Sequence, residues 1–261
     1  MSPAFDPTAA ASLLAAAWKR GEQIIELPEA IRPMSLSEGY DVQDALLEDL
    51  GEEPAGWKLG IASRNGMRQA KLDRPVAGRV LQAYCVSPGA TVVMNNDAPV
   101  TVEFEVAFTL SKDVGPGAMP TKLEDIIAST LVTFELLQSR FVDFRAAGLP
   151  SFAADNGGFR ALIIGDPIDP RDLGALVESA SVEVEGQQRA KGRSGDDLID
   201  PYESLSGLLR HAQERGVTLR KGEIVSTGSF TLPFDVVGPR SEVLARFLDR
   251  TMRVTVVAAT A

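Results

Sequence analysis

Two glutamates in the apolar stretch 100-VTVEFEVAFTL-110 are the first residues whose spacing points to chemistry. Valine and phenylalanine alternate with Glu103 and Glu105, which predicts a half-buried β-strand with both carboxylates on the face opposite the apolar side chains. Like charges about 7 Å apart on one strand face repel each other. The pair therefore faces open solvent or holds a cation.

A third acid, Glu135, interrupts another apolar run, 131-LVTFELLQSR-140. If neighbouring strands bring it to Glu103 and Glu105, the three carboxylates form an oxygen-rich site suited to Mg²⁺ or Mn²⁺, with positions left for water or substrate. An exposed acidic strand face is the alternative.

One lysine stands out in the same way. Lys58 lies in 56-GWKLGIA-62, between large apolar neighbours and two glycines that would let a substrate approach the backbone. It either snorkels from a strand edge or is a partly desolvated amine, whose lowered pKa would let it transfer protons near neutral pH.

Two polar segments carry further candidates. Asp155 and Asn156 precede a glycine pair and either hold a substrate carboxylate or a water molecule, or form an Asx turn. Thr227, Gly228 and Ser229 lie near the end of an expected strand, where backbone N–H groups bind anions. A strand with a bulge at the glycine is the alternative there.

The single histidine, His211, lies in 205-LSGLLRHAQERG-216, whose leucine spacing predicts a helix that ends at a glycine. We expect His211 to make a favourable charge–dipole contact near the helix C-terminus. Histidine-rich zinc sites and Ser-His-Asp triads need imidazoles in the site. The chemistry of an enzyme with this sequence should therefore depend on carboxylates, lysine and metal.

The composition limits the partners. The chain has 261 residues, of which 44% are hydrophobic, and a net charge of −10, so it can bury a sizeable core but offers no basic surface for nucleic acid or an anionic membrane. The segment 9-AAASLLAAAW-18 is too short to span a bilayer, and Cys85, the single cysteine, forms no internal disulfide. We expect a cytosolic protein that acts on a small molecule.

The apolar periodicity predicts an α+β fold. Helices over residues 7–20 and 36–51 and a strand over 56–62 would form an N-terminal helical subdomain, residues 1–80, ahead of a mixed β catalytic domain, residues 81–261. The strands expected in the second part cover residues 100–110, 131–138, 160–165, 181–186, 223–231 and 252–258.

Two short helices are predicted between these strands. A capping box of Thr121 and Glu124 predicts a helix over residues 125–130. Asp169, followed by proline, predicts the cap and first turn of a helix over residues 171–179.

Taken together, several segments resemble the fumarylacetoacetate hydrolase superfamily, specifically its 2-oxo-4-pentenoate hydratase and 4-oxalocrotonate decarboxylase branch. They follow one another in family-like order and spacing over nearly the whole chain. The matching segments are 57-WKLGIAS-63, 103-EFEVAFTLSKDV-114, 134-FELLQSR-140, 153-AADN-156, 192-GRSGDDLIDP-201 and 221-KGEIVSTGSF-230.

The resemblance implies a mixed β-sandwich roll with an N-terminal helical portion, assembled into a homo-oligomer. It also implies that Glu103, Glu105 and Glu135 ligate Mg²⁺ or Mn²⁺, with Lys58 as an acid/base group beside a 2-oxo acid. The ion would withdraw electrons and stabilise an enolate of that substrate. The pair 155–156 would orient substrate or water.

The implied reaction is hydration of a 2-hydroxy-2,4-dienoate, of the 2-oxo-4-pentenoate type, to a 4-hydroxy-2-oxo acid, as in the catabolism of aromatic compounds. The alternative is decarboxylation of a 2-oxo-3-enedioate (4-oxalocrotonate) on the same scaffold. Hydrolysis of a carbon–carbon bond is less favoured, because it commonly uses a histidine near the metal. A non-catalytic partner subunit with the same fold is the remaining alternative.

Three positions differ from the family pattern. Val76 stands where hydratases tend to have an acid, and Asp200 stands where a histidine often precedes the proline. Leu232 replaces an arginine that is typical of relatives acting on dicarboxylic oxo acids, so a monocarboxylate substrate is favoured. A distal carboxylate would need another arginine, and the candidates are Arg64, Arg74 and Arg79. Of these we expect Arg79 to bind substrate, together with residues 227–229.

Overall fold

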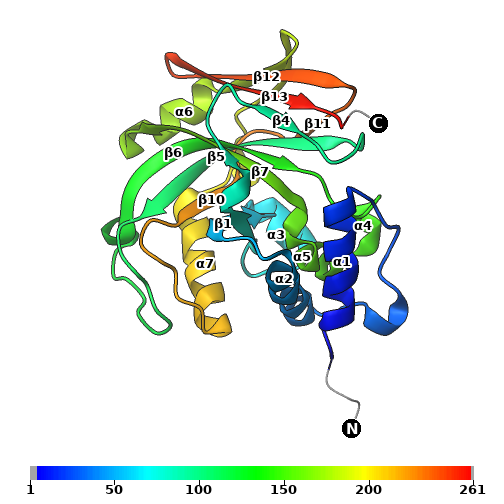
Figure 1. Cartoon of the computed structure of the whole chain (residues 1–261). Helices are drawn as coiled ribbons and strands as arrows, with labels where there is room; N and C mark the ends of the chain where they lie inside the picture. Colours follow the sequence, from blue (N-terminus) through cyan, green and yellow to red (C-terminus); the bar gives the residue numbers. More distant parts are fainter. Residues whose placement is uncertain (1–4, 260–261) are drawn as a thin grey trace.

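The computed structural model describes residues 5–259, which form two β-sheets and seven α-helices (Figure 1). The larger sheet has eight strands and lies between the smaller sheet on one side and helices on the other. Its strands, in order, are β2 (Val76–Leu81), β1 (Pro54–Gly60), β10 (Ile224–Ser229), β5 (Val100–Leu110), β6 (Ile127–Leu137), β7 (Phe159–Ile168) and β3 (Cys85–Val86), with β11 (Phe234–Val236) beside β5. The predicted α+β class is confirmed.

The smaller sheet has five strands and covers one face of the larger sheet (Figure 1). In order, these are β4 (Thr91–Val93), β13 (Arg250–Val257), β12 (Arg240–Phe247), β8 (Ser181–Val184) and β9 (Gln187–Lys191). Both sheets are mixed, because β1 pairs with β10 and β4 with β13 in parallel while their other neighbours are largely antiparallel.

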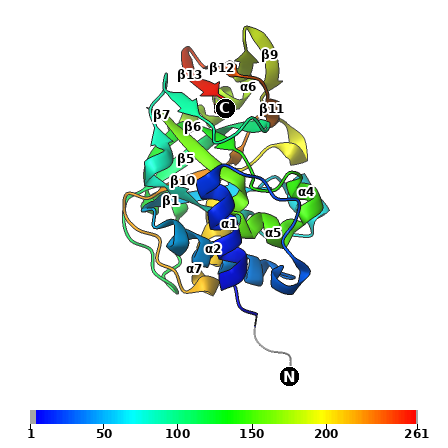
Figure 2. The ribbon, with the colours of Figure 1, turned by 45° about the vertical axis from the view of Figure 1, so that its right-hand side comes forward.

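The N-terminal helices are confirmed as α1 (Thr8–Arg20) and α2 (Leu36–Leu50). A capping box of Ser35 and Glu38 begins α2. In both views α1 and α2 lie beside α5 (Leu149–Ala154), and their apolar faces share a cluster that includes Phe141 (Figure 2). β1 and β2 belong to the larger sheet, and the division of the chain at residue 80 stays a prediction.

The other helices are α3 (Arg64–Ala70), α4 (Phe144–Ala147), α6 (Leu173–Ser179) and α7 (Pro201–Arg215). Short 3₁₀ turns occur at Glu29–Ile31, Gln82–Tyr84, Leu123–Ile126, Asn156–Gly158, Pro170–Asp172 and Gly195–Asp197. The Asp169 side chain accepts a hydrogen bond from the Arg171 N–H group, which confirms the predicted cap ahead of α6. Within the described range, no helix is long and apolar enough to cross a membrane.

The helix predicted over residues 125–130 is wrong. The chain makes one 3₁₀ turn, Leu123–Ile126, and then enters β6 at Ile127. β6 pairs with both β5 and β7, and Ser129 faces Thr109 across the first of these ladders at an oxygen–oxygen distance of 2.5 Å. The pairing of β6 with strands on both sides, together with the β-branched Ile127 at its start, therefore outweighs the capping box as a local helix signal.

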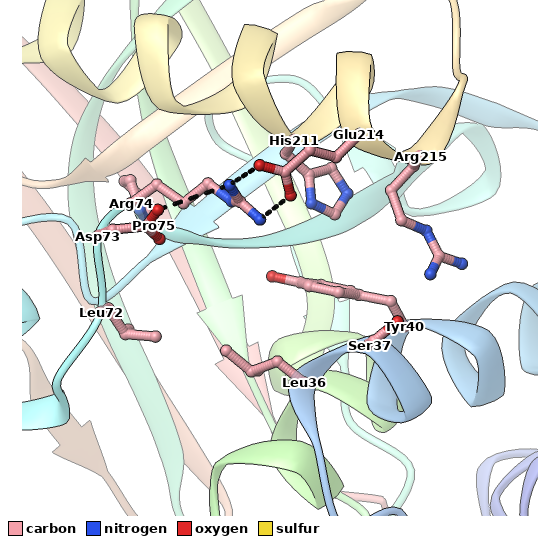
Figure 3. A pocket seen from close by; sticks show the side chains of 10 residues that line it. All are labelled: Leu36, Ser37, Tyr40, Leu72, Asp73, Arg74, Pro75, His211, Glu214 and Arg215. Carbon is pink, nitrogen blue, oxygen red and sulfur yellow. Dashed lines mark hydrogen bonds and ion pairs between the residues drawn. The ribbon is translucent and has the colours of Figure 1, made fainter. Parts of the chain in front are cut away.

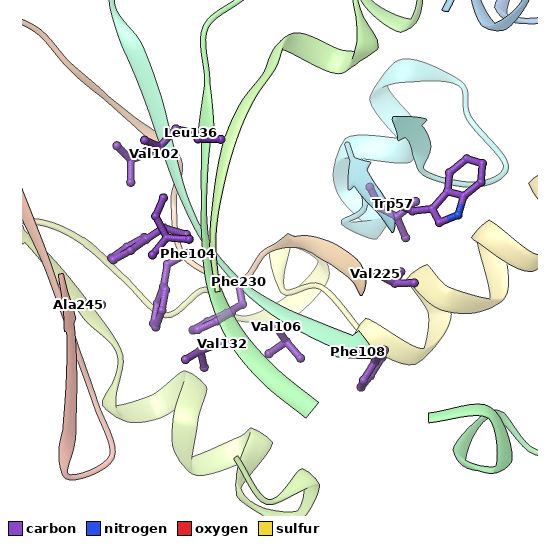
Figure 4. Close-up of a cluster of buried hydrophobic side chains, with 14 of the residues drawn as sticks. Trp57, Val102, Phe104, Val106, Phe108, Val132, Leu136, Val225, Phe230 and Ala245 are labelled. Carbon is purple, nitrogen blue, oxygen red and sulfur yellow. The ribbon is translucent and has the colours of Figure 1, made fainter. Parts of the chain in front are cut away.

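The apolar face of β5 forms the core between the two sheets (Figure 4). Phe104 is fully buried, and its ring centroid lies 5.1 Å from that of Phe134, 4.9 Å from Phe230 and 5.3 Å from Phe247 of the smaller sheet. Aromatic contacts at this spacing add to the burial of apolar area. Because alternate residues point to opposite faces, this packing turns the β5 glutamates away from the smaller sheet.

Candidate metal centre and active site

Adjacent strands bring the three predicted glutamates together. Glu103 on β5 is the direct cross-strand partner of Glu135 on β6, and Glu105 follows two residues later on the same face. One carboxylate oxygen from each residue lies within 4.8 Å of the others. The cross-strand register thus creates a cluster of carboxylates in which Glu135 lies 32 positions after Glu103 and 30 after Glu105 in the sequence.

The glutamate cluster has the donor set of a divalent-metal site. Glu105 and Glu135 are fully buried, and Glu103 is half-buried. Within residues 5–259, Glu105 Oε1 and both carboxylate oxygens of Glu135 accept no hydrogen bond, and Glu135 Oε1 is balanced only by an ion pair with Lys58. Buried carboxylate oxygens without hydrogen bonds are costly, whereas hard oxygen ligands are what Mg²⁺ and Mn²⁺ prefer. The cluster could therefore hold such an ion.

Burial and mutual repulsion raise the pKa values of Glu105 and Glu135. Burial, followed by the charges of Glu135 and Glu103, raises the pKa of Glu105 well above its usual range. Burial raises the pKa of Glu135 to about 7, with the Lys58 ammonium opposing the rise and Glu103 adding to it. Charge neutralisation, by protons or by a cation, is therefore favourable at this place.

Lys58 on β1 reaches the glutamate cluster across β10, the strand that lies between β1 and β5. It is 1% exposed, its Nζ lies 3.1 Å from Glu135 Oε1 as an ion pair, and it donates a hydrogen bond to the Gly157 carbonyl oxygen at 3.1 Å. Burial alone would lower the pKa of Lys58, but the three glutamates together raise it above its ordinary value. The predicted lowering of the Lys58 pKa is therefore wrong while the charges of the three glutamates are not neutralised by a cation.

Glycine makes room for this lysine. A Cβ on Gly78 would lie 2.9 Å from Lys58 Cδ and 3.0 Å from Asn156 Oδ1, which is closer than real contacts allow. The missing side chain lets the Lys58 stem pass between β2 and the 3₁₀ turn at Asn156–Gly158.

Two donors from β10 fix the orientation of Glu105. Ser226 Oγ donates to Glu105 Oε2 at 2.6 Å, and the Gly228 N–H group donates to the same oxygen at 2.9 Å. Gly228 has a φ of 102°, and a Cβ there would lie 2.8 Å from Ile199 Cδ1. The backbone bend at Gly228 aims its N–H group at Glu105 and leaves Oε1 free for a ligand.

A Ser226→Ala variant tests this orientation. We expect Mn²⁺ affinity to fall by about 10-fold, because outer-shell hydrogen bonds of this type typically contribute factors of 10–100. Isothermal titration calorimetry measures the change. The matched control is Thr227→Val, which removes a buried hydroxyl that donates to the Val106 carbonyl oxygen at 2.7 Å rather than to a glutamate. Equal affinity losses in both variants would contradict the assignment.

A cavity of about 750 Å³ opens beside the glutamate cluster. Its wall includes Lys58, Glu103, Gly228 and Ser229, so two of the three predicted strand-end residues face the same space as the cluster. The lining also includes residues that follow β6, namely Ser139, Phe141, Phe144 and Arg145, together with Phe152 of α5. The volume is suited to a small organic acid.

Asp155 and Asn156 lie behind this wall and do not line the cavity. Asp155 forms a buried ion pair with Arg140 and accepts a hydrogen bond from Ser139 Oγ at 2.7 Å. Asn156 Oδ1 accepts from the Arg79 N–H group at 2.6 Å, and its Nδ2 donates to the Arg79 carbonyl oxygen at 2.9 Å. Both residues thereby fix the turn whose next carbonyl group, at residue 157, accepts from Lys58.

The predicted arginines are engaged elsewhere. Arg79 stacks on the Trp57 ring at 3.9 Å and pairs with Glu223 at 2.9 Å, outside the cavity lining. The structure pairs Arg64 with Glu203 and Arg74 with Glu214. Thr227 also lies outside the lining, because its hydroxyl turns back to β5. Of the predicted substrate-binding residues, Gly228 and Ser229 line the cavity, whereas Arg79 and Thr227 do not.

His211 is far from this chemistry. Its ring centroid lies 4.5 Å from that of Tyr40 and 5.8 Å from that of Trp57, at the edge of a separate cavity of about 390 Å³ (Figure 3). Burial lowers the pKa of His211 to about 4, and the charges of Arg74 and Arg215 add to the shift. The imidazole is therefore uncharged at neutral pH, and the predicted charge–dipole contact is wrong.

The buried neutral imidazole should make stability depend on pH. The pKa of His211 is about 4 in the folded chain and 6.5 in its ordinary state, so between these values the unfolded chain binds more protons and stability falls as pH falls. We expect the wild type to lose about 2 kcal/mol more than His211→Phe between pH 7 and pH 4.5. Urea unfolding at both pH values measures this, and parallel losses would contradict it.

Comparisons with known proteins identify enzymes that are similar to the chain over most of its length. No model of a protein family matches the chain. The chain is 27% identical over 227 residues to 4-oxalocrotonate decarboxylase from Pseudomonas putida, covering 82% of each protein. It is 24% identical over 192 residues to 2-keto-4-pentenoate hydratase from Burkholderia vietnamiensis, covering 72% of each.

Solved structures show the same fold. The 4-oxalocrotonate decarboxylase from Pseudomonas putida G7, complexed with magnesium and adipate, superposes with a TM-score of 0.82 over 97% of both chains at 22% identity. Fumarylpyruvate hydrolase from Pseudomonas aeruginosa, in complex with Mn²⁺ and pyruvate, gives a TM-score of 0.53 at 18% identity and covers 78% of this chain and 89% of that one. The resemblance found in the sequence is confirmed.

Proposed function

We propose that this chain, which has the fold of the fumarylacetoacetate hydrolase superfamily, is a divalent-metal-dependent lyase that hydrates a 2-hydroxy-2,4-dienoate to a 4-hydroxy-2-oxo acid in aromatic-compound catabolism. The observation that carries the proposal is the convergence of three carboxylates and a buried lysine beside one cavity. Relatives named as hydratases and decarboxylases support the same class of reaction.

We assign Glu103, Glu105 and Glu135 as the ligands of Mg²⁺ or Mn²⁺. When bound, the ion would supply electron withdrawal from the carboxylate and 2-oxo group of the substrate. Glu105 and Glu135 are fully buried and held by their neighbours, so they are preorganised for this role. Half-buried Glu103 lines the cavity and keeps the cluster open to substrate.

Lys58 is the proton-transfer group in this proposal. Its Nζ lies between the Glu135 carboxylate and the Gly157 carbonyl oxygen, and the residue lines the cavity. In hydration, Lys58 would deliver the proton that converts the dienol to the ketone, before water adds to the conjugated double bond. The buried pair 155–156 has a positioning role, because it fixes the turn that carries residue 157.

Decarboxylation of a 2-oxo-3-enedioate is the second candidate, and Val76 favours it. Val76 is 2% exposed and does not line the cavity, so no acid stands there to activate water. Loss of CO₂ needs an electron sink and a proton for the resulting carbanion, and Lys58 can supply that proton. Carbon–carbon bond hydrolysis is less favoured, because His211 lies outside the cavity lining.

Product analysis separates these reactions. The protein is incubated with Mg²⁺ or Mn²⁺ and either 2-hydroxypenta-2,4-dienoate or 2-oxohex-3-enedioate, with a chelator-treated sample as control. Metal-dependent gain of one water by the first substrate establishes the hydratase, and metal-dependent CO₂ release from the second establishes the decarboxylase. No turnover of either would contradict the proposed lyase and favour a non-catalytic partner subunit.

We also propose that the protein is a cytosolic homo-oligomer without a nucleic-acid or membrane partner. Its net charge of −10 supports the absence of such partners. Six large apolar side chains of the described residues are each more than half exposed, which supports a contact between subunits: Ile25, Met34, Val93, Val142, Leu232 and Val237. Light scattering coupled to size-exclusion chromatography measures the assembly, and a monomer at micromolar concentration would contradict it.

A further inference from the structure

The cationic side chains of the 750 Å³ cavity differ in their availability. Lys58, Arg145 and Arg193 are the lysine and arginine residues of its lining. Lys58 is engaged by Glu135 and by a backbone carbonyl group. Arg145 is exposed and stacks on the Phe144 ring at 4.5 Å. Arg193 remains as a shielded cation that faces the cavity.

The backbone at Arg193 is fixed beside the end of β10. The Arg193 N–H group donates to the Phe230 carbonyl oxygen at 2.9 Å, and Gly192 forms a β-bridge with Thr231. A Cβ on Gly192 would lie 1.9 Å from the Val177 carbonyl oxygen, so the segment is packed closely on both sides. Arg193 is thus held against the strand end that also provides Gly228 and Ser229 to the cavity wall.

The Arg193 guanidinium group has unused donors. Its side chain is 20% exposed, and along residues 5–259 it makes no side-chain hydrogen bond. Its Nη2 forms an ion pair with Asp197 Oδ1 at 3.4 Å, and the same oxygen accepts a hydrogen bond from Asn65 Nδ2 at 2.8 Å. A guanidinium group carries five N–H donors, and shielded donors are normally paired.

Asp197, the ion-pair partner of Arg193, lies outside the cavity lining, and no acid in the lining forms an ion pair with Arg193 within the described residues. Asp143 accepts hydrogen bonds from the N–H groups of Arg145 and Ala146 as the cap of α4. Asp235 accepts from Thr101 Oγ1 at 2.6 Å. The unused guanidinium donors are therefore available to an anionic group of a bound molecule.

We infer that Arg193 binds the distal carboxylate of the substrate, so that the cavity selects dicarboxylic 2-oxo acids over monocarboxylic ones. The inference rests on the proposed function, in which the glutamate cluster binds the 2-oxo acid end through a metal ion. A planar guanidinium group matches a carboxylate with two parallel hydrogen bonds. The monocarboxylate preference expected from Leu232 is thereby reversed, because an arginine from a different loop fills the role.

Two unreactive probes of equal chain length test the inference without turnover. Binding of 2-oxoadipate and of 2-oxohexanoate to the Mg²⁺-loaded protein is measured by isothermal titration calorimetry. We expect the wild type to bind the dicarboxylate about 30-fold more tightly, the effect of one charge-assisted contact. In Arg193→Gln the ratio should fall to about 1 through loss of dicarboxylate affinity alone.

Arg145→Gln is the matched control, because it removes the same charge from the same cavity lining. We expect it to retain the dicarboxylate preference, and Arg193→Lys to retain part of it, since lysine keeps the charge but not the planar fork. Circular dichroism checks that each variant is folded. A wild-type ratio of about 1, or a preference that survives in Arg193→Gln, would overturn the inference.

Turnover provides an independent readout. If the proposed lyase activity is correct, Arg193→Gln should raise KM for the dicarboxylic substrate and leave kcat nearly unchanged. If the binding preference depends on Arg193 but neither lyase substrate is converted, the proposed function fails while the dicarboxylate site stands. If turnover occurs without any dicarboxylate preference, the inference fails while the proposed function stands.

Discussion

Replacing Glu135 with glutamine should abolish Mg²⁺ and Mn²⁺ binding, and with it turnover, while the fold survives. Glu135 contributes two buried carboxylate oxygens without hydrogen-bond partners and is the cross-strand neighbour of Glu103. Glutamine keeps the shape but removes the charge, so we expect Mn²⁺ affinity to fall by more than about 100-fold. Lys58 Nζ lies 3.1 Å from Glu135 Oε1, so it can donate a hydrogen bond to the amide oxygen of the variant, which preserves the local structure.

Calorimetric titration of Mn²⁺ into wild type and variant measures this effect. The matched control is Glu242→Gln, which removes an exposed glutamate from β12 in the smaller sheet. The control should bind Mn²⁺ like the wild type, and circular dichroism should show both variants folded. Unchanged Mn²⁺ affinity in Glu135→Gln would remove Glu135 from the metal site.

Replacing Lys58 with methionine should lower kcat by about 10²–10⁴-fold, the usual contribution of a positioned acid or base. Methionine has a similar unbranched shape and fills the buried channel, but it carries no proton. Metal binding should persist, because the bound cation itself neutralises the glutamate carboxylates once the Lys58 ammonium is removed. Steady-state turnover and Mn²⁺ titration on the same preparation separate the two effects.

Lys191→Met is the control for this variant, because Lys191 is an exposed lysine on β9 outside the cavity lining. Its turnover should match the wild type. If Lys58→Met also retained wild-type turnover, Lys58 would have no part in proton transfer. If it lost metal binding as well as turnover, its role would be structural.

The strand faces were predictable because they depend on local alternation. The alternating pattern of residues 100–110 predicts that Glu103 and Glu105 share one strand face. The structure has β5 over the same residues. Whether Glu135 meets them depends on the register between β5 and β6, which no local pattern determines. The family resemblance supplied that information.

Other parts of the site depend on contacts between residues far apart in the sequence, so local patterns did not give their roles. Ser226 lies in a run of small polar residues, and its contact with Glu105 spans 121 positions. Arg193 lies in a loop whose position depends on packing against Phe230 and Val177. Asp155 was predicted to orient substrate or water. Its carboxylate forms an ion pair with Arg140, because a buried charge needs a partner of opposite charge.

The measurement that tests the central claim most directly is the location of Mn²⁺ in crystals of the protein by anomalous scattering, with a 2-oxo acid present. We predict one strong peak within bonding distance of carboxylate oxygens of Glu103, Glu105 and Glu135, next to the cavity lined by Lys58. A peak elsewhere, or no peak at saturating Mn²⁺, would contradict the assignment of this cluster as the metal centre.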